Sequence, residues 1–150
     1  MSSAASAGIP AGFAEVHMGG EFMRHNGPLY LRKAEGRVWM GFRVEARHCN
    51  PAQICHGGMM ASFCDMLLPV CATHLAPSLL GRFMPTISLQ LDYLAPTSIG
   101  AWVQGEAQLL RHTPVLVFLQ GLVTADELPV ARASGIFRVG PVMAEHADQA

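Results

Sequence analysis

The segment from Asn50 to Leu75, NPAQICHGGMMASFCDMLLPVCATHL, contains a single acidic residue, Asp65, and no lysine or arginine. On a helical wheel, its Met, Phe, Leu and Cys side chains occupy nearly every side. A helix that is apolar all round is buried in the middle of a protein. The segment therefore predicts a long central helix from about Gly57 to Leu75. Pro69, in its interior, is expected to kink this helix or to end its first half.

Most of the remaining chain shows the alternation of apolar and polar residues that is typical of half-buried strands. Before the central helix, residues 13–25 fit a short leading helix, followed by an extended segment at 29–33 and a strand at 37–47. One helix and then a meander of antiparallel strands is an α+β pattern. We therefore expect a curved antiparallel sheet wrapped around one central helix. The strand-like segments after the helix cover residues 86–93, 101–111, 115–124 and 128–139.

The chain has 150 residues and is most simply one domain. We expect that domain at residues 13–140, with a flexible lead of small residues at 1–12 and a flexible tail at 141–150. The N-terminus lacks the charged and apolar regions of a secretory signal. Two glycines, an aspartate and a proline interrupt the longest weakly charged stretch too often for a membrane span. A cytoplasmic protein without a membrane partner is expected.

Charge and cysteine usage argue against several functions. The formal net charge is -1 and no run of lysine or arginine occurs, so a nucleic acid or an anionic membrane has no electrostatic support as a partner. His48-Cys49 and Cys55-His56 would be a conceivable zinc set, but their spacing matches none of the usual ones. The alternative, which we prefer, is four reduced and mostly buried thiols in a reducing compartment.

Asp65 is the residue that most needs an explanation. Burying an unpaired carboxylate costs several kcal/mol, roughly, unless it is hydrogen-bonded or neutralised. Gly58, Ala61 and Ala72 share its side of the helix and are small, so a ligand or a second helix can approach there. The alternatives are a solvent-facing aspartate and a catalytic carboxylate, and the apolar surroundings favour the catalytic one.

The sequence His56-Gly57-Gly58 opens the helix, although glycine lowers helix propensity. Glycine lets a substrate approach the backbone closely, and the first N–H groups of a helix have no partner within the helix. Such amides carry partial positive charge and can receive a polarised carbonyl. An ordinary glycine-rich turn is the alternative. Asn50 precedes His56 by six residues, and taken alone it is more typical of a turn than of a ligand contact.

Helix geometry places a demand on these two features. Gly57 and Asp65 are eight residues apart, so their Cα atoms are separated by about 12 Å along one helix. Both cannot lie within hydrogen-bonding reach of one reacting carbonyl. If both act on one substrate, they come from two copies of the chain. A two-fold dimer with antiparallel helices would supply two identical composite sites, so the hypothesis requires an obligate homodimer.

Three stretches together resemble a known family: HCNPAQICHGGMMASFCD, TISLQLDYLAPTSIGA and ELPVARASGIFRV. Their core is an asparagine, His-Gly-Gly six residues later and an aspartate nine residues after the histidine. This pattern resembles the hotdog-fold acyl-CoA thioesterases of the PaaI-like group, from about Phe22 to Val139. The resemblance implies the hotdog fold, and subunits that pair into dimers and often into tetramers.

The resemblance also implies roles for individual residues. The N–H of Gly57 would polarise the thioester carbonyl, with Asn50 and His56 helping to place it. Asp65 of the opposite subunit would act as nucleophile or as general base on water, and Thr86 would help to orient that water. The chain departs from the family at Gln53, where glycine is common, and at Pro69, which is unusual. The departure at Gln53 bears on substrate choice more than on reaction type.

We therefore expect an acyl-CoA thioesterase. A polarised carbonyl beside a positioned carboxylate needs no metal and no redox cofactor, and coenzyme A enters as part of the substrate. An enoyl-thioester hydratase on the same fold and a non-catalytic acyl-CoA binder are the alternatives. The sequence does not predict the length of the acyl group or whether it is aromatic or aliphatic. Gly58 is a candidate for substrate contact, and the candidate cations for the phosphates of coenzyme A are Arg82, Arg111, His112 and Arg47.

Overall fold

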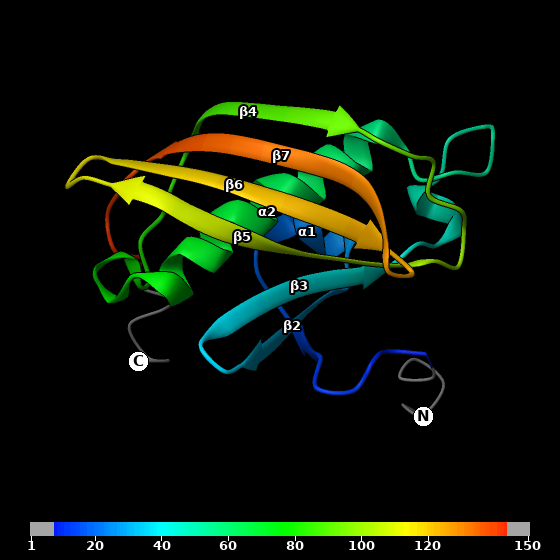
Figure 1. Ribbon diagram of the computed structural model, residues 1–150, viewed down its shortest axis with the longest axis horizontal. Helices are drawn as coiled ribbons and strands as arrows, with labels where there is room; N and C mark the ends of the chain where they lie inside the picture. The colour runs from blue at the N-terminus through cyan, green and yellow to red at the C-terminus, as the bar shows by residue number, and fades with distance from the viewer. Residues whose placement is uncertain (1–7, 144–150) are drawn as a thin grey trace.

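A computed structural model of the chain describes residues 8–143. Figure 1 labels its helices and its strands from β2 to β7, and two 3-10 turns at Ala46–His48 and Pro77–Leu79 complete the structure. In chain order the elements are β1 (Ala14–Val16), α1 (Gly20–Asn26), β2 (Leu29–Ala34), β3 (Arg37–Arg43), α2 (Gly57–Leu75), β4 (Thr86–Tyr93), β5 (Trp102–His112), β6 (Leu116–Ala125) and β7 (Leu128–Arg138).

All seven strands belong to one antiparallel sheet with the order β1-β2-β3-β5-β6-β7-β4. The sheet curves around α2, which runs diagonally behind its long strands (Figure 1). The predicted α+β hotdog architecture is thereby confirmed. β4 pairs with β7 on one side and forms the free edge of the sheet on the other.

The central helix spans Gly57–Leu75, as predicted, and Pro69 neither ends it nor divides it. Proline has no N–H, so the carbonyl of Asp65 lacks its usual helical donor. By length and composition alone α2 could cross a membrane, but it packs inside the sheet as a core helix. Its buried side chains are Met59, Met60, Phe63, Cys64, Leu67, Leu68, Cys71 and Ala72.

Glycines on the inner face of three neighbouring strands allow α2 to lie close to the sheet. A Cβ added at Gly105 would stand 2.6 Å from Leu67, and one added at Gly135 would stand 2.9 Å from Leu68. Real side chains essentially never make such contacts. The absence of side chains here therefore sets the distance between helix and sheet.

The leading helix predicted at residues 13–25 is wrong in its first half. Residues 14–16 form β1, and α1 begins only at Gly20 because Gly19 adopts a left-handed conformation (φ 84°) as its N-cap. The strand predicted at 37–47 ends at Arg43 and gives way to a 3-10 turn.

Residues 8–12 and 141–143 of the two ends that were expected to be flexible belong to the described part of the chain. Phe13 N–H donates to the Pro10 carbonyl (3.3 Å), and Met143 N–H donates to the Gly81 carbonyl (3.0 Å). Residues 1–7 and 144–150 lie outside the described residues. The division of the chain at residues 13 and 140 stays a prediction.

Candidate active site

The N-terminus of α2 carries unused backbone donors in the described part of the chain, and Gly57 N–H is one of them. His56 is the N-cap, and its Nδ1 accepts a hydrogen bond from Gly58 N–H (2.8 Å). The first helical hydrogen bond runs from Met60 N–H to the His56 carbonyl (3.1 Å). Within residues 8–143, Gly57 N–H has no acceptor, and Gly57 itself is only half-buried. This amide is therefore available to a ligand, whereas the amide of Gly58 is occupied by the cap.

Tyr93, the last residue of β4, fixes the position of Gly57. Its hydroxyl donates to the Gly57 carbonyl (2.6 Å), and a Cβ at Gly57 would stand 3.4 Å from the tyrosine ring. From the sequence, Tyr93 had no predicted role beyond its place in YLAP, residues 93–96 of the stretch TISLQLDYLAPTSIGA. That motif, where the strand ends, was the available signal.

A pocket of about 380 Å³ lies beside this helix end. Two predicted site residues, Asn50 and Gly57, line it. Most of the other lining side chains are apolar, which suits the acyl part of a ligand rather than a charged group. They are Ile54, Cys55, Met60, Tyr93, Leu94, Ala95, Pro96, Thr97 and Val130.

Asn50 organises the loop that leads to the helix. Its Oδ1 accepts hydrogen bonds from Ala52 N–H (3.0 Å) and Ile54 N–H (3.4 Å). The backbone closes the same loop, because Asn50 N–H donates to the Ile54 carbonyl (2.9 Å). The residue is thus a turn former that also faces the pocket.

Asp65 lies in the middle of α2, half-buried, and bonds to Thr86 at the start of β4. Thr86 Oγ1 donates to Asp65 Oδ1 at 2.6 Å. No ion pair involves Asp65 in the described part of the chain. The structure thus brings together two of the predicted site residues, and their roles in the reaction stay a prediction. One carboxylate oxygen is held by the hydroxyl, and the other is left without a protein donor.

The two halves of the predicted site are separate within one protomer. Asp65 and Thr86 are not among the residues that line the pocket beside Gly57. This agrees with the separation of about 12 Å expected for eight residues of helix. One chain presents an amide-lined pocket at one end of β4 and a held carboxylate at the other.

The candidate cations for coenzyme A have different surroundings. Arg47 is engaged, because its guanidinium donates to the carbonyls of His25 (2.5 Å) and Gly27. Arg82 Nη1 donates to the Gly140 carbonyl (3.3 Å). Arg111 and His112 are exposed at the end of β5. The strand registers place His112 in one row with Val117, Phe137 and Thr86, at the Asp65 end of the sheet.

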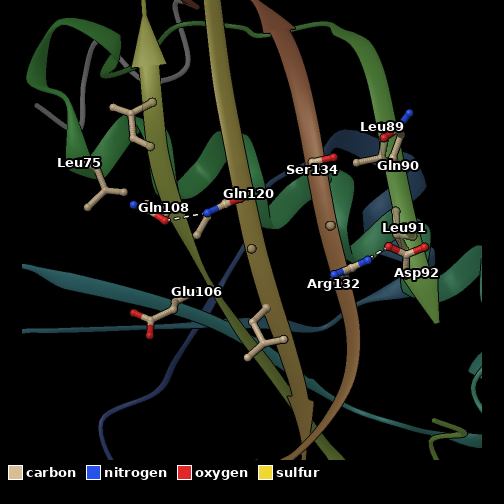
Figure 2. Close-up of a pocket in the computed structure, with 15 residues that line it drawn as sticks. Leu75, Leu89, Gln90, Leu91, Asp92, Glu106, Gln108, Gln120, Arg132 and Ser134 are labelled. Atoms are coloured by element: carbon tan, nitrogen blue, oxygen red, sulfur yellow. Dashed lines mark hydrogen bonds and ion pairs between the residues drawn. The ribbon is translucent and has the colours of Figure 1, made fainter. Parts of the chain in front are cut away.

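A larger hollow, of about 1400 Å³, lies elsewhere and contains none of the predicted site residues. Figure 2 shows its floor over β4 to β7, with Gln108 bonded to Gln120 and Arg132 bonded to Asp92. Gln120 and Arg132 alternate with buried residues that face α2, so this open trough is on the outer face of the sheet. Two pairs of its polar side chains bond to each other, and we assign the site to the smaller pocket, which Asn50 and Gly57 line.

His48 packs against the same loop and uses both of its ring nitrogens there, which argues against the zinc set of His48-Cys49 and Cys55-His56. Its Nδ1 accepts from Glu45 N–H (3.0 Å), its Nε2 donates to the Asn26 carbonyl (2.8 Å), and only 2% of the residue is exposed. Both ring nitrogens are thus used, and no metal-binding cluster occurs among residues 8–143. The His48 carbonyl accepts from His56 N–H (2.8 Å), which ties the buried ring to the helix N-cap.

Acid is expected to destabilise the protein through His48. Burial lowers the pKa of this histidine, so the unfolded chain takes up the proton more readily. Stability is therefore fully present above about pH 6.5, the value for an unfolded histidine, and falls as the pH drops below it. Urea unfolding at pH 7.5 and 5.5 measures this loss. His48→Gln is the matched control, since it removes the titrating ring and should show a smaller loss. Equal losses in the two proteins would contradict the assignment.

The thioesterase superfamily matches residues 52–131, more than half of the chain. The chain belongs to the thioesterase superfamily. The match covers the HGG sequence, α2 and the strands from β4 to the start of β7. The resemblance to hotdog thioesterases that the sequence motifs indicated is confirmed.

Several thioesterase superfamily relatives resemble the chain along most of its length. PA0474 of Pseudomonas aeruginosa, whose name gives it provisionally as an esterase, is 25% identical over 133 residues, which cover 87% of this chain and 97% of the relative. Zebrafish thioesterase superfamily member 2 has the same fold, with a TM-score of 0.70, 22% identity, and coverage of 81% of this chain and 88% of that one.

Two bacterial structures also share the fold. The Escherichia coli PaaI protein of the phenylacetic acid degradation operon has a TM-score of 0.67 and 17% identity, covering 83% of this chain and 88% of its own. A protein from Streptococcus pneumoniae described as a hypothetical thioesterase, solved with coenzyme A, has a TM-score of 0.65 and 17% identity, covering 77% of this chain and 91% of its own. These structures therefore share the hotdog fold of this chain.

The departure from the thioesterase pattern at Gln53 has a backbone explanation. Gln53 adopts a left-handed conformation (φ 63°), and its N–H donates to the Asn50 carbonyl (2.9 Å). A turn followed by a left-handed residue is the geometry of a three-residue hairpin loop, for which glycine is the preferred residue. Gln53 is exposed and does not line the pocket. A glycine at this position would therefore favour the left-handed backbone conformation and would not change a pocket contact.

Gln53→Gly is expected to stabilise the protein by about 1 kcal/mol, because glycine relieves the left-handed strain. Urea denaturation followed by circular dichroism measures the free energy of unfolding. Ala52→Gly is the matched control in the same loop, where φ is not positive and glycine should be neutral or destabilising. A destabilised Gln53→Gly protein would show that the glutamine side chain has a role that the loop geometry does not reveal.

Proposed function

We propose that this protein is an acyl-CoA thioesterase, which hydrolyses an acyl-CoA to a free acid and coenzyme A. The observation that carries the proposal is the arrangement along β4. At one end, Tyr93 bonds to Gly57, whose N–H is unused beside an apolar pocket. At the other end, Thr86 bonds to the carboxylate of Asp65. Membership of the thioesterase superfamily supports the same reaction.

A second copy of the chain completes the site in this proposal. β4 is a free edge of the sheet, and unpaired edge strands with exposed apolar side chains pair with other chains. Ile87 (58% exposed) and Leu94 (50%) are such side chains in or next to β4. When two β4 strands pair antiparallel about a two-fold axis, the Thr86 end of one lies beside the Tyr93 end of the other. Asp65 of one chain then approaches Gly57 of its partner.

The reaction follows from this composite site. The acyl group enters the apolar pocket, and Gly57 N–H donates to the thioester carbonyl oxygen, where negative charge develops. Asp65 of the partner acts as nucleophile on the carbonyl carbon or as general base on a water molecule. Thr86 binds one carboxylate oxygen and leaves the other directed to the reaction. The C–S bond breaks, and coenzyme A leaves as the thiolate, which takes up a proton. On the nucleophilic route, water then hydrolyses the acyl anhydride on Asp65 and releases the free acid.

The remaining functional assignments follow from this chemistry. Coenzyme A is a substrate part, so the reaction uses only groups of the chain itself. We expect a cytoplasmic dimer, which pairs further into a tetramer. Arg111 and His112 are the candidates for binding the phosphates of coenzyme A, because they lie exposed at the Asp65 end of the sheet. The Nδ1 of His56 accepts the hydrogen bond of the helix cap, so its proton is on Nε2, and the hydratase alternative is left to the assay below.

The experiment that tests the proposal is a panel of aromatic and aliphatic acyl-CoAs assayed for release of the coenzyme A thiol. The expected result is enzyme-dependent thiol release, above a blank that corrects for the protein's own cysteines. Crotonyl-CoA is included, because hydration without thiol release would indicate a hydratase. Thermal stabilisation by acyl-CoA without any turnover would overturn the proposal in favour of a binding protein.

A further inference from the structure

Cys49 and Cys55 face each other across a short antiparallel bridge that closes the loop at residues 50–54. The flanking hydrogen bonds run from Asn50 N–H to the Ile54 carbonyl (2.9 Å) and from His56 N–H to the His48 carbonyl (2.8 Å). This pattern makes the two cysteines a non-hydrogen-bonded pair. In such pairs the Cα atoms lie about 4.5 Å apart, and the side chains project to the same face.

That spacing lies at the short end of the range that disulfides accept, about 4.4–6.8 Å between Cα atoms. Both residues are free thiols. Cys49 Sγ donates to the Glu45 carbonyl (3.4 Å) and Cys55 Sγ to the His56 carbonyl (3.7 Å). Burial, together with a smaller effect of a charge on Cys49, raises the pKa of Cys55 to about 11, so the two sulfur atoms are within electrostatic reach. A rotation of each side chain would join them.

We propose that Cys49 and Cys55 form a reversible intrachain disulfide beside the pocket. The oxidant is a low-molecular-weight disulfide of the glutathione class. The thiolate of half-buried Cys49 attacks one sulfur of this oxidant, whose S–S bond breaks and releases one small thiol. Cys55, losing its proton, then attacks Cys49 Sγ and expels the second small thiol. Two protein thiols become one disulfide, and the oxidant gains the two electrons.

The other two cysteines provide an internal comparison. Cys64 and Cys71 are fully buried in α2, and burial raises the pKa of each thiol to about 12. Neither therefore supplies an accessible thiolate. Disulfides that solvent can reach are among the labile ones that cellular thiols reduce, and Cys49 is only half-buried. The pair is thus suited to a reversible change in a reducing compartment.

The pair is coupled to the site through its neighbours. The disulfide would enclose Asn50 in a closed ring of residues and turn the sulfur of Cys55, which lines the pocket, toward Cys49. His56, the cap of α2, follows directly in the chain. We therefore expect oxidation to lower turnover several-fold. This consequence rests on the proposed function, whereas formation of the disulfide does not.

The test equilibrates the full chain with oxidised and reduced glutathione, blocks the remaining thiols with N-ethylmaleimide in denaturant, and counts them by mass. The number of blocked thiols should fall from four to two. Fragmentation of the peptide should yield no backbone ions between Cys49 and Cys55 until dithiothreitol is added. Cys55→Ser should instead keep a glutathione adduct on Cys49, since no second thiol can displace it.

Three outcomes of the mass measurement would overturn the proposal: a stable glutathione adduct on Cys49 in the wild-type protein, a disulfide between chains, or equal oxidation of Cys64 and Cys71. Turnover is measured in parallel, with Cys49→Ser as the variant that oxidation should leave unaffected. A disulfide that forms without changing turnover would contradict the coupling to the site. A disulfide in a protein that never releases coenzyme A would support the Cys49–Cys55 disulfide and overturn the proposed function.

Discussion

Asp65→Asn is expected to fold and to dimerise like the wild-type protein but to lose turnover by about 10²–10⁴-fold, the usual contribution of a general base. Asparagine keeps the shape of the side chain, and its oxygen still accepts the hydrogen bond that Thr86 donates to Asp65 at 2.6 Å. An amide is neither a base nor a nucleophile at neutral pH, so the chemical step should fail while substrate binding persists. The kcat from thiol release measures the loss.

Asp92→Asn is the matched control for this variant. Asp92 lies on β4, like Thr86, but it forms an ion pair with Arg132 (2.7 Å) on the outer face of the sheet. The same change of charge there should leave kcat within about two-fold of the wild type, because surface ion pairs contribute little. Hydrolysis by Asp65→Asn at the wild-type rate would remove Asp65 from the mechanism.

Ile87→Lys is expected to convert the dimer into monomers and to abolish most thioester hydrolysis. Ile87 is 58% exposed on the free edge strand β4. In a two-fold dimer each substitution acts twice, so two apolar contacts are lost and two ammonium groups approach the interface. At about 1.5–3 kcal/mol for each of the two buried isoleucines, the dissociation constant should rise by about 10²- to 10⁴-fold. Size-exclusion chromatography with light scattering measures the mass.

Phe22→Lys is the control for Ile87→Lys. Phe22 is 62% exposed on α1, the helix between β1 and β2 at the other end of the sheet order. This variant loses a similar apolar surface, and it should remain dimeric and active. A monomeric Ile87→Lys protein that cleaves thioesters at full rate would show that one chain is sufficient.

The sequence predicted the parts of the fold that carry a strong periodic pattern. Gly57–Leu75 is helical within the predicted bounds because its apolar residues cover all sides of the helix. The strand at 86–93 is likewise confirmed. The region before β2 was predicted less well, since β1 has only three residues and Gly19 and Gly20 both have positive φ. Short edge strands and glycine conformations leave little periodic signal.

The site was predictable where residues act through their own side chains. Asp65 and Thr86, which are 21 residues apart, were named together through the family resemblance and are hydrogen-bonded. Tyr93 was missed because its role is to hold a backbone carbonyl, and such contacts depend on how a strand end meets a helix end. The bridge between Cys49 and Cys55 was missed for a similar reason, since it depends on the register of a loop. Pro69 still has no functional explanation beyond the freed Asp65 carbonyl.

The shared site is tested most directly by mixing two inactive chains. Asp65→Asn keeps the amide of Gly57, and Gly57→Val keeps Asp65 but obstructs the carbonyl position. Co-expression with two different tags and tandem purification isolates the mixed dimer. One of its two sites then combines an intact Gly57 with an intact Asp65, so turnover should recover to about half of the wild-type value per dimer. Mixed dimers as inactive as either parent would contradict a site built from two chains.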